Sequence, residues 1–271
     1  MCLIAFAWQP RSPFKLVVAA NRDEFYERPT AAARFWEDAP QLLAGRDLSA
    51  GGSWLGITRD GRFAAVTNYR EPGKLRADAR SRGELVTEFL RAREPPGDYL
   101  RTHAGLGDRY NGFNLLVGDG HGLYYWSNRA GAPRRLSPGL YGLSNHQLDT
   151  PWPKVQRAKE GLRLWLAEGG SCLGDLARVL ADSEPAPDHL LPATGLGLEW
   201  ERLLSAMLIA SESYGTRCTT VVTWRQDGRI DFLEVPRGPE QGPTRRFSFA
   251  LPAASSAGAD YPALGAAPLR C

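Results

Sequence analysis

Two short apolar runs near the start of the chain constrain its fold more than any other feature. The runs cover residues 2–8 and 15–20, and a turn with Pro10 and Pro13 separates them. Two such runs joined by a proline-containing turn are typical of a β-hairpin. Apolar residues occupy successive as well as alternate positions in both runs. Both faces of the predicted sheet should therefore be covered by other parts of the protein.

The rest of the chain combines further strand patterns with a few amphipathic helices. Short strand patterns occur over residues 53–58, 62–67, 113–117, 122–128, 140–144, 216–224 and 230–235. Apolar residues at helical spacing predict helices over residues 81–93, 152–168 and 173–181. Residues 184–197 are rich in Pro and Gly and are predicted to form a loop. This order of strands, helices and strands favours an α+β fold in which helices cover the outer faces of sheets.

We find no internal repeat and no linker that would separate two hydrophobic cores. A single domain over residues 1–251 is therefore expected. Residues 252–271 are rich in Ala, Ser, Gly and Pro, and they are predicted to be a disordered tail.

Charge and cysteine content exclude several classes of protein. The 33 basic and 30 acidic residues are mixed along the chain, without the basic clusters expected of a nucleic-acid-binding protein. The four cysteines form no CxxC pair, which argues against a bound metal. No run of eighteen apolar residues would span a membrane, and no secretory signal is recognisable. We expect a cytoplasmic protein with reduced thiols and without a metal cofactor.

Cys2 is the first candidate for chemistry. Removal of Met1 is expected because cysteine is small, and it would place a thiol and a free α-amine on one residue. Such an amine has a pKa of about 8 and can take the proton of the thiol near neutral pH, so that nucleophile and base form one unit. The alternative is that Cys2 is a small buried residue at the start of a strand.

The polar segment Asn21-Arg22-Asp23-Glu24 follows directly on the second apolar run. If the two runs form a hairpin, this segment lies at the same sheet edge as Cys2. Asp23 could then orient the α-ammonium group, and Arg22 could favour the thiolate. A solvated turn is the alternative interpretation.

These features resemble those of the NRDE family, the transport-and-Golgi-organisation family, which takes its name from this tetrapeptide. Two later stretches are also similar to that family, residues 145–154 and residues 214–222, and the likeness runs from Cys2 to about Val235. The family is in turn similar to the choloylglycine hydrolase and penicillin acylase group of N-terminal-nucleophile hydrolases. The resemblance implies a four-layer αββα sandwich of two antiparallel sheets.

The resemblance also implies a set of site residues. Besides the nucleophile Cys2, the matching positions are Asp23, Asn68, Asn145 and Arg217. The asparagine amides would stabilise an oxyanion, although most asparagines at such positions cap strand ends. Arg217 would pair with Asp23 or with a substrate carboxylate, and an ordinary ion pair is the alternative.

One departure concerns the arginine near the nucleophile. The hydrolases have Arg-Asn-x-Asp, whereas this chain has Ala20-Asn21-Arg22-Asp23. Asn21 therefore matches, and we expect the shifted Arg22 to face the opposite side of the strand. Asn21, Arg22 and His146 are the residues expected to bind a ligand.

The leading functional hypothesis is an N-terminal cysteine amidohydrolase or acyl-transfer protein. It would act on a small amide or thioester with an apolar acyl group and would need no cofactor. The alternative is a non-catalytic haem or lipid carrier that serves trafficking or lipid metabolism through the same pocket. For haem, the candidate ligands are His146, His103 and the cysteines. A third hypothesis is an interaction module with exposed Trp126 and Trp152.

Overall fold

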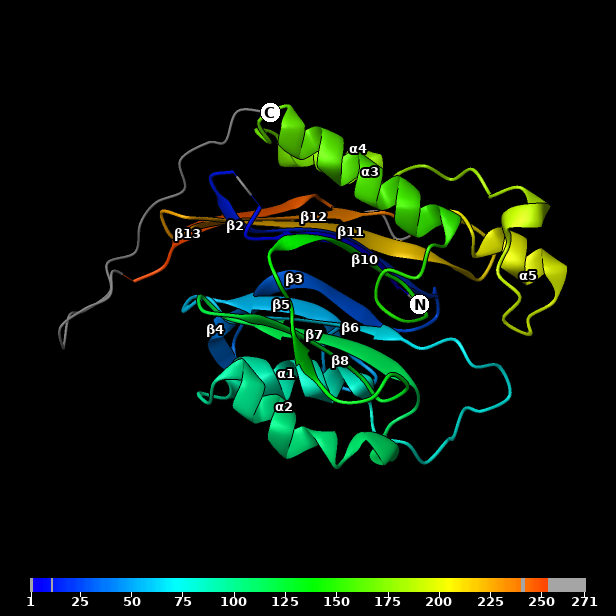
Figure 1. The fold of residues 1–271 in the computed structure, drawn as a ribbon, viewed down its shortest axis with the longest axis horizontal. Coiled ribbons are helices and arrows are strands. Elements are labelled where there is room, and N and C mark those ends of the chain that lie inside the picture. Colours follow the sequence, from blue (N-terminus) through cyan, green and yellow to red (C-terminus); the bar gives the residue numbers. More distant parts are fainter. Residues whose placement is uncertain (1, 11, 240–241, 253–271) are drawn as a thin grey trace.

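Two antiparallel sheets lie face to face, and helices cover both outer faces (Figure 1). The computed structural model describes residues 2–10, 12–239 and 242–252. The predicted α+β, four-layer αββα sandwich is therefore confirmed. Most of the predicted tail lies outside the described residues.

The first sheet contains the N-terminal hairpin at its centre. Its strand order is β10 (Gly139–Leu143), β1 (Cys2–Trp8), β2 (Phe14–Phe25), β11 (Tyr214–Arg225), β12 (Arg229–Pro236) and β13 (Arg245–Ala250). The second sheet follows chain order, with β3 (Thr30–Trp36), β4 (Ala39–Asp47), β5 (Leu55–Thr58), β6 (Phe63–Asn68), β7 (Phe113–Gly118), β8 (Leu123–Ser127) and β9 (Arg134–Arg135).

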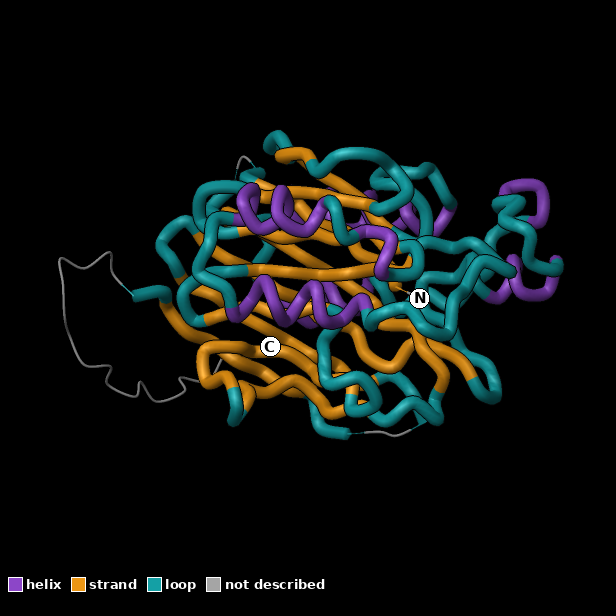
Figure 2. The backbone as a smooth tube through the Cα atoms, turned by 90° about the horizontal axis from the view of Figure 1, so that it is seen from below, coloured by secondary structure: helices purple, strands orange, loops and turns teal. Residues whose placement is uncertain are grey.

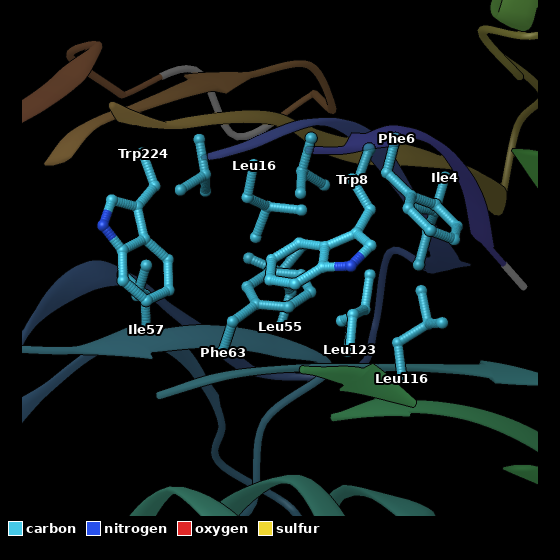
Figure 3. Packing of buried hydrophobic residues seen from close by; sticks show 14 of the residues in the cluster. Ile4, Phe6, Trp8, Leu16, Leu55, Ile57, Phe63, Leu116, Leu123 and Trp224 are labelled. Atoms are coloured by element: carbon cyan, nitrogen blue, oxygen red, sulfur yellow. The ribbon is translucent and has the colours of Figure 1, made fainter. Parts of the chain in front are cut away.

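The hairpin is buried on both faces, as its apolar runs predict. Ile4, Phe6 and Trp8 of β1 point toward the second sheet, where they meet residues such as Phe63 and Leu116 (Figure 3). The intervening Leu3, Ala5 and Ala7 pack instead in a separate core beneath the helices. Alternate side chains of a strand point to opposite faces, so each face of β1 contributes to a different core.

Three helices of the outer layers match the amphipathic segments predicted over residues 81–93, 152–168 and 173–181. On the first sheet lie α3 (Pro153–Ala167) and α4 (Leu173–Val179), and Val155, Ala158 and Leu162 of α3 join the core beneath them. On the second sheet lie α1 (Arg82–Arg91) and α2 (Pro96–Ala104). Figure 2 shows helices lying over the strands of the sheet nearest the viewer. The short α5 (Leu198–Leu203) lies beside the sandwich, at the same end as the N-terminus.

Several elements were not predicted, among them β3, β4, β13, α2 and α5. The pair β3–β4 was missed because the buried positions of β3 are sparse and the apolar run of β4 is short. We expected Pro95-Pro96-Gly97 only to end a helix, but Pro96 also begins α2, where proline fits because the first helical turn needs no N–H donor. The loop over residues 184–197 holds a short 3-10 turn, Asp188–Leu190.

None of the helices in the described ranges is long and apolar enough to cross a membrane. Cys2, Cys172 and Cys218 are free thiols.

Candidate active site

A pocket of about 410 Å³ opens at the edge of the sandwich where β1 begins. Four predicted site residues line it: Cys2, Arg22, Asp23 and Asn68. The other lining residues come from β2, β4 and β6, from the loops before β3, β5 and β7, and from the segment that leads into and begins α1. They are Glu24, Arg28, Asp47, Ser53, Trp54, Val66, Arg76, Ala77, Ala79, Arg80, Ser81, Arg82, Gly83 and Asn111. Both sheets therefore contribute to one concave site around the thiol.

Cys2 is half-buried and is the first residue of β1. Burial raises the pKa of its thiol, and the Asp23 carboxylate adds to this effect. Arg22 and the Asp23 backbone N–H, which donates a hydrogen bond to the sulfur, lower the same pKa. Because burial is the largest of these effects, the thiol needs a nearby base to react at neutral pH.

Arg22 lies on the same face of the sheet as Cys2, directly opposite it in the β1–β2 ladder. Our expectation that it would face the other side was wrong, because positions 20 and 22 of a strand share one face. The Arg22 guanidinium donates to Thr30 Oγ1 at 2.8 Å and lies 4.2 Å from the centre of the Trp54 ring. These contacts fix a positive charge beside the sulfur.

Asp23 faces the helical layer and is 1% exposed. Its Oδ1 accepts a hydrogen bond from Thr216 Oγ1 at 2.7 Å. Burial raises the pKa of this carboxyl, and the positive charge of Lys154 is the largest opposing effect. Asp23 thus lies behind Cys2, with a buried cation near it.

The two predicted asparagines lie together, but only Asn68 lines the pocket. Asn145 is fully buried, and its Nδ2 donates to the backbone oxygen of Asn68 at 3.0 Å. The neighbouring Ser144 donates to the backbone oxygen of Cys2 at 3.1 Å. Asn145 therefore supports the position of Asn68 from behind the pocket wall, and Ser144 supports that of Cys2.

Arg217 is not among the residues that line the Cys2 pocket. It is the extra residue of a β-bulge, because Thr216 pairs with Asp23 and Cys218 pairs with Arg22. Its Nη1 donates to the backbone oxygens of Phe25 and Arg28, and it lines a second pocket with Cys218 and Glu234. The bulge re-aims the side chain, which corrects our expectation that Arg217 joins the nucleophile.

Asn21 and His146, predicted to bind a ligand, also lie outside the pocket lining. Asn21 is buried, and its amide bonds the backbone oxygens of Leu180 and Met207 and the hydroxyl of Thr219. His146 bonds Thr150 Oγ1 through Nδ1, and burial lowers its pKa.

A haem in the Cys2 pocket would find no histidine among the described lining residues. His103 lies on α2, where Nδ1 contacts the Tyr99 backbone oxygen. The expected histidine ligands therefore do not fit a haem in this pocket. The described residues also hold no cluster of three or more His, Cys, Asp or Glu that would bind a metal ion.

Two further features of the site were missed from the sequence. Lys154 is 1% exposed and lies near Asp23 and Cys2. It ends the stretch 145–154 that resembles the NRDE family, and a lysine in the first turn of a helix is unfavourable to the helix dipole. Those two signals together could have identified it. The second feature is a set of five arginines in the described pocket lining, Arg22, Arg28, Arg76, Arg80 and Arg82.

The family model described as Transport and Golgi organisation 2 matches residues 1–237. The Transport and Golgi organization protein 2 homolog of Bos taurus is 39% identical over 258 residues, which cover 86% of this chain and 92% of the relative. The homolog of Homo sapiens is 38% identical over 277 residues, covering 93% and 99%. These names state no reaction.

Among solved structures, a Caenorhabditis elegans N-acylethanolamine-hydrolyzing acid amidase ortholog matches with a TM-score of 0.45 and 11% identity, covering 81% of this chain and 92% of that chain. A mutant conjugated bile acid hydrolase from Clostridium perfringens matches with a TM-score of 0.47 and 8% identity, covering 90% and 92%.

Proposed function

The chain belongs to the Transport and Golgi organisation 2 family, and from that premise we propose that it is an acyl-transfer enzyme whose nucleophile is the Cys2 thiol. The observation that carries the proposal is the meeting of Cys2, Asp23 and Arg22 at one pocket. After removal of Met1, the α-amine of Cys2 would lie opposite Asp23, because Cys2 itself pairs with Arg22 in the antiparallel ladder.

In the proposed reaction the α-amine takes the proton of the thiol, and the sulfur attacks the carbonyl carbon of an amide or thioester. A C–S bond forms, the bond to the leaving group breaks, and the leaving group takes the proton from the α-ammonium. The product is a thioester on Cys2. Water or another acceptor then gives a proton to the amine and attacks the carbonyl carbon of the thioester. The C–S bond breaks, the acyl group leaves on the acceptor, and the sulfur takes the proton back from the α-ammonium.

Asn68 is the proposed amide donor to the oxyanion, since it lines the pocket and its backbone is held by Asn145. A fixed donor of this kind lowers the barrier by about 3 kcal/mol. Asn145 acts through Asn68 in this scheme.

The pocket wall favours a substrate with two unlike parts. Trp54, Val66 and Ala79 supply apolar surface for the acyl group that the sequence led us to expect. Arg22 and Arg82 donate hydrogen bonds to the neutral oxygens Thr30 Oγ1 and Gly112 O, so their charges are available to an anionic group of the substrate. We propose an amide or thioester with an apolar acyl chain and a polar, negatively charged leaving portion.

The test is the acylation of Cys2 by p-nitrophenyl acetate. Intact mass first establishes whether Met1 is absent. The wild-type protein is expected to release a burst of p-nitrophenolate and to gain one acetyl group at Cys2, and Cys2→Ala is expected to lose both. Cys172→Ala, which replaces a thiol outside the pocket lining, serves as the matched control. Equal labelling in wild type and Cys2→Ala would leave only non-catalytic binding in this pocket.

A further inference from the structure

Lys154 is a buried lysine that the fold alone does not explain. It lies in the first turn of α3 and is 1% exposed. Its Nζ has no hydrogen-bond partner among the described residues. Lysine is rarely buried without a partner, and an ammonium group at a helix N-terminus is also disfavoured by the helix dipole. Because burial and the helix dipole both disfavour an ammonium group at this position, we infer that the positive charge of Lys154 has a function.

The titratable and charged groups that interact most strongly with Lys154 lie on several different elements. They are Asp23 on β2, Cys2 on β1, Arg70 after β6 and Glu201 on α5. Arg70 and Glu201 form a buried ion pair at 2.8 Å, so their charges balance each other. Lys154 and Asp23 remain as one positive and one negative charge behind Cys2.

The α-amine of a processed chain would be the third charged group of this set. Cys2 pairs with Arg22, so its nitrogen lies toward Asp23, the next residue of β2. Asp23 faces the helical layer that carries Lys154, whereas Arg22 faces the space between the sheets. The carboxylate of Asp23 would therefore be shared by two amines, the α-amine of Cys2 and the Nζ of Lys154.

We propose that Lys154 is a positioning residue that balances the charge of Asp23 and thereby keeps the α-amine of Cys2 uncharged and able to accept the thiol proton. The inference rests on the proposed function of Cys2. A buried site with one carboxylate holds one positive charge at far lower cost than two. While Lys154 carries that charge, the α-amine stays neutral. Lys154 keeps its own protons throughout; the transferred proton moves from the Cys2 sulfur to the α-amine and then to the leaving group.

The ionisation of the cluster agrees with this arrangement. Burial lowers the pKa of Lys154 to about 8, and Asp23 opposes the shift. Lys154 is therefore charged at neutral pH, and it begins to lose its proton at a pH just above neutral. Groups that interact this closely titrate together, so the loss of one cation raises the proton affinity of the other.

The test measures the ionisation of the α-amine directly. Wild-type protein and Lys154→Met are labelled with ¹³C-cysteine, and the Cα shift of Cys2, assigned by its loss in Cys2→Ser, is followed against pH. Lys154→Met is expected to raise the titration midpoint of the amine by about one unit, a tenfold higher proton affinity. The acid limb of the p-nitrophenyl acetate burst should move to higher pH by the same amount.

Three controls separate this effect from a structural role. Lys154→Arg keeps the positive charge and should restore the low midpoint. Lys159→Met removes a lysine of the same helix whose Nζ bonds Asp149 at 2.7 Å, and it should change nothing. Lys154→Gln replaces Lys154→Met if the latter does not fold.

An unchanged amine midpoint in Lys154→Met would overturn the inference, even with a lower unfolding temperature. A wild-type protein without a burst would overturn the proposed function, and the midpoint measurement would still decide the role of Lys154.

Discussion

Cys2 and Arg22 lie directly opposite each other in the β1–β2 ladder and face the same pocket. Trp54 and Thr30 hold the guanidinium in place. The positive charge therefore lies permanently beside the sulfur and opposes the effect of burial on the thiol.

Replacement of Arg22 by Met should raise the pKa of the Cys2 thiol, because the charge that favours the thiolate is lost. The rate at which iodoacetamide alkylates Cys2, measured by mass spectrometry at a series of pH values, should therefore rise at a higher pH than in wild type. Arg22→Lys should keep part of the effect, since it retains the charge but loses the planar stacking on Trp54. If the pH profile of alkylation in Arg22→Met were identical to that of wild type, the role of Arg22 in favouring the thiolate would be contradicted.

Asn68→Ala and Asn145→Ala should differ in kind. Asn68→Ala should reduce the acylation rate by roughly 10²-fold to 10³-fold with little loss of stability, because it removes a donor to the oxyanion. Asn145→Ala should in addition lower the free energy of unfolding by about 1–3 kcal/mol, because it leaves buried partners without hydrogen bonds. Burst kinetics and urea denaturation separate the two effects. Equal stability losses in both variants would count against the division of roles.

Arg217→Ala should leave the acylation rate within about twofold to threefold of wild type. The side chain lines a separate pocket and bonds the backbone oxygens of Phe25 and Arg28. Its removal should instead cost about 1–3 kcal/mol of stability. The acylation rate and the free energy of unfolding are measured on the same protein preparation. A hundredfold loss of acylation rate would show that Arg217 is a catalytic residue after all.

Lys154 should also give the protein a measurable pH dependence of stability. Its folded-state pKa of about 8 lies below the value of about 10.4 for an exposed lysine. Between these values the unfolded chain binds more protons, so the contribution of Lys154 to stability rises with pH through this window. Relative to Lys154→Met, the wild-type free energy of unfolding should increase by on the order of 1–3 kcal/mol between pH 7 and pH 10. If the difference in free energy of unfolding between the two proteins stayed constant from pH 7 to pH 10, a lowered pKa of Lys154 would be excluded.

Local pattern was sufficient for the α+β class, the N-terminal hairpin and the helices α1, α3 and α4. The doubly apolar runs over residues 2–8 and 15–20 required cover on both faces, and the spacing of Val155, Ala158 and Leu162 required one helical face to be buried. The strands β3 and β4 were not predicted because β3 lies at the edge of its sheet with few buried positions, and the apolar run of β4 is short.

The sequence patterns by themselves determined an α+β fold with helices outside its sheets, and they placed Cys2 and Asp23 at one end of a hairpin, because strand periodicity and turn positions are local properties. The four-layer order followed from the family resemblance. Only the tertiary structure decided which side chains meet at that end of the hairpin. A single bulge in β11 turns Arg217 away from Asp23, and the packing of α3 on the first sheet brings Lys154 from more than a hundred residues along the chain to the same carboxylate. Strand register and helix packing involve distant parts of the chain, and their geometry cannot be read from neighbouring residues.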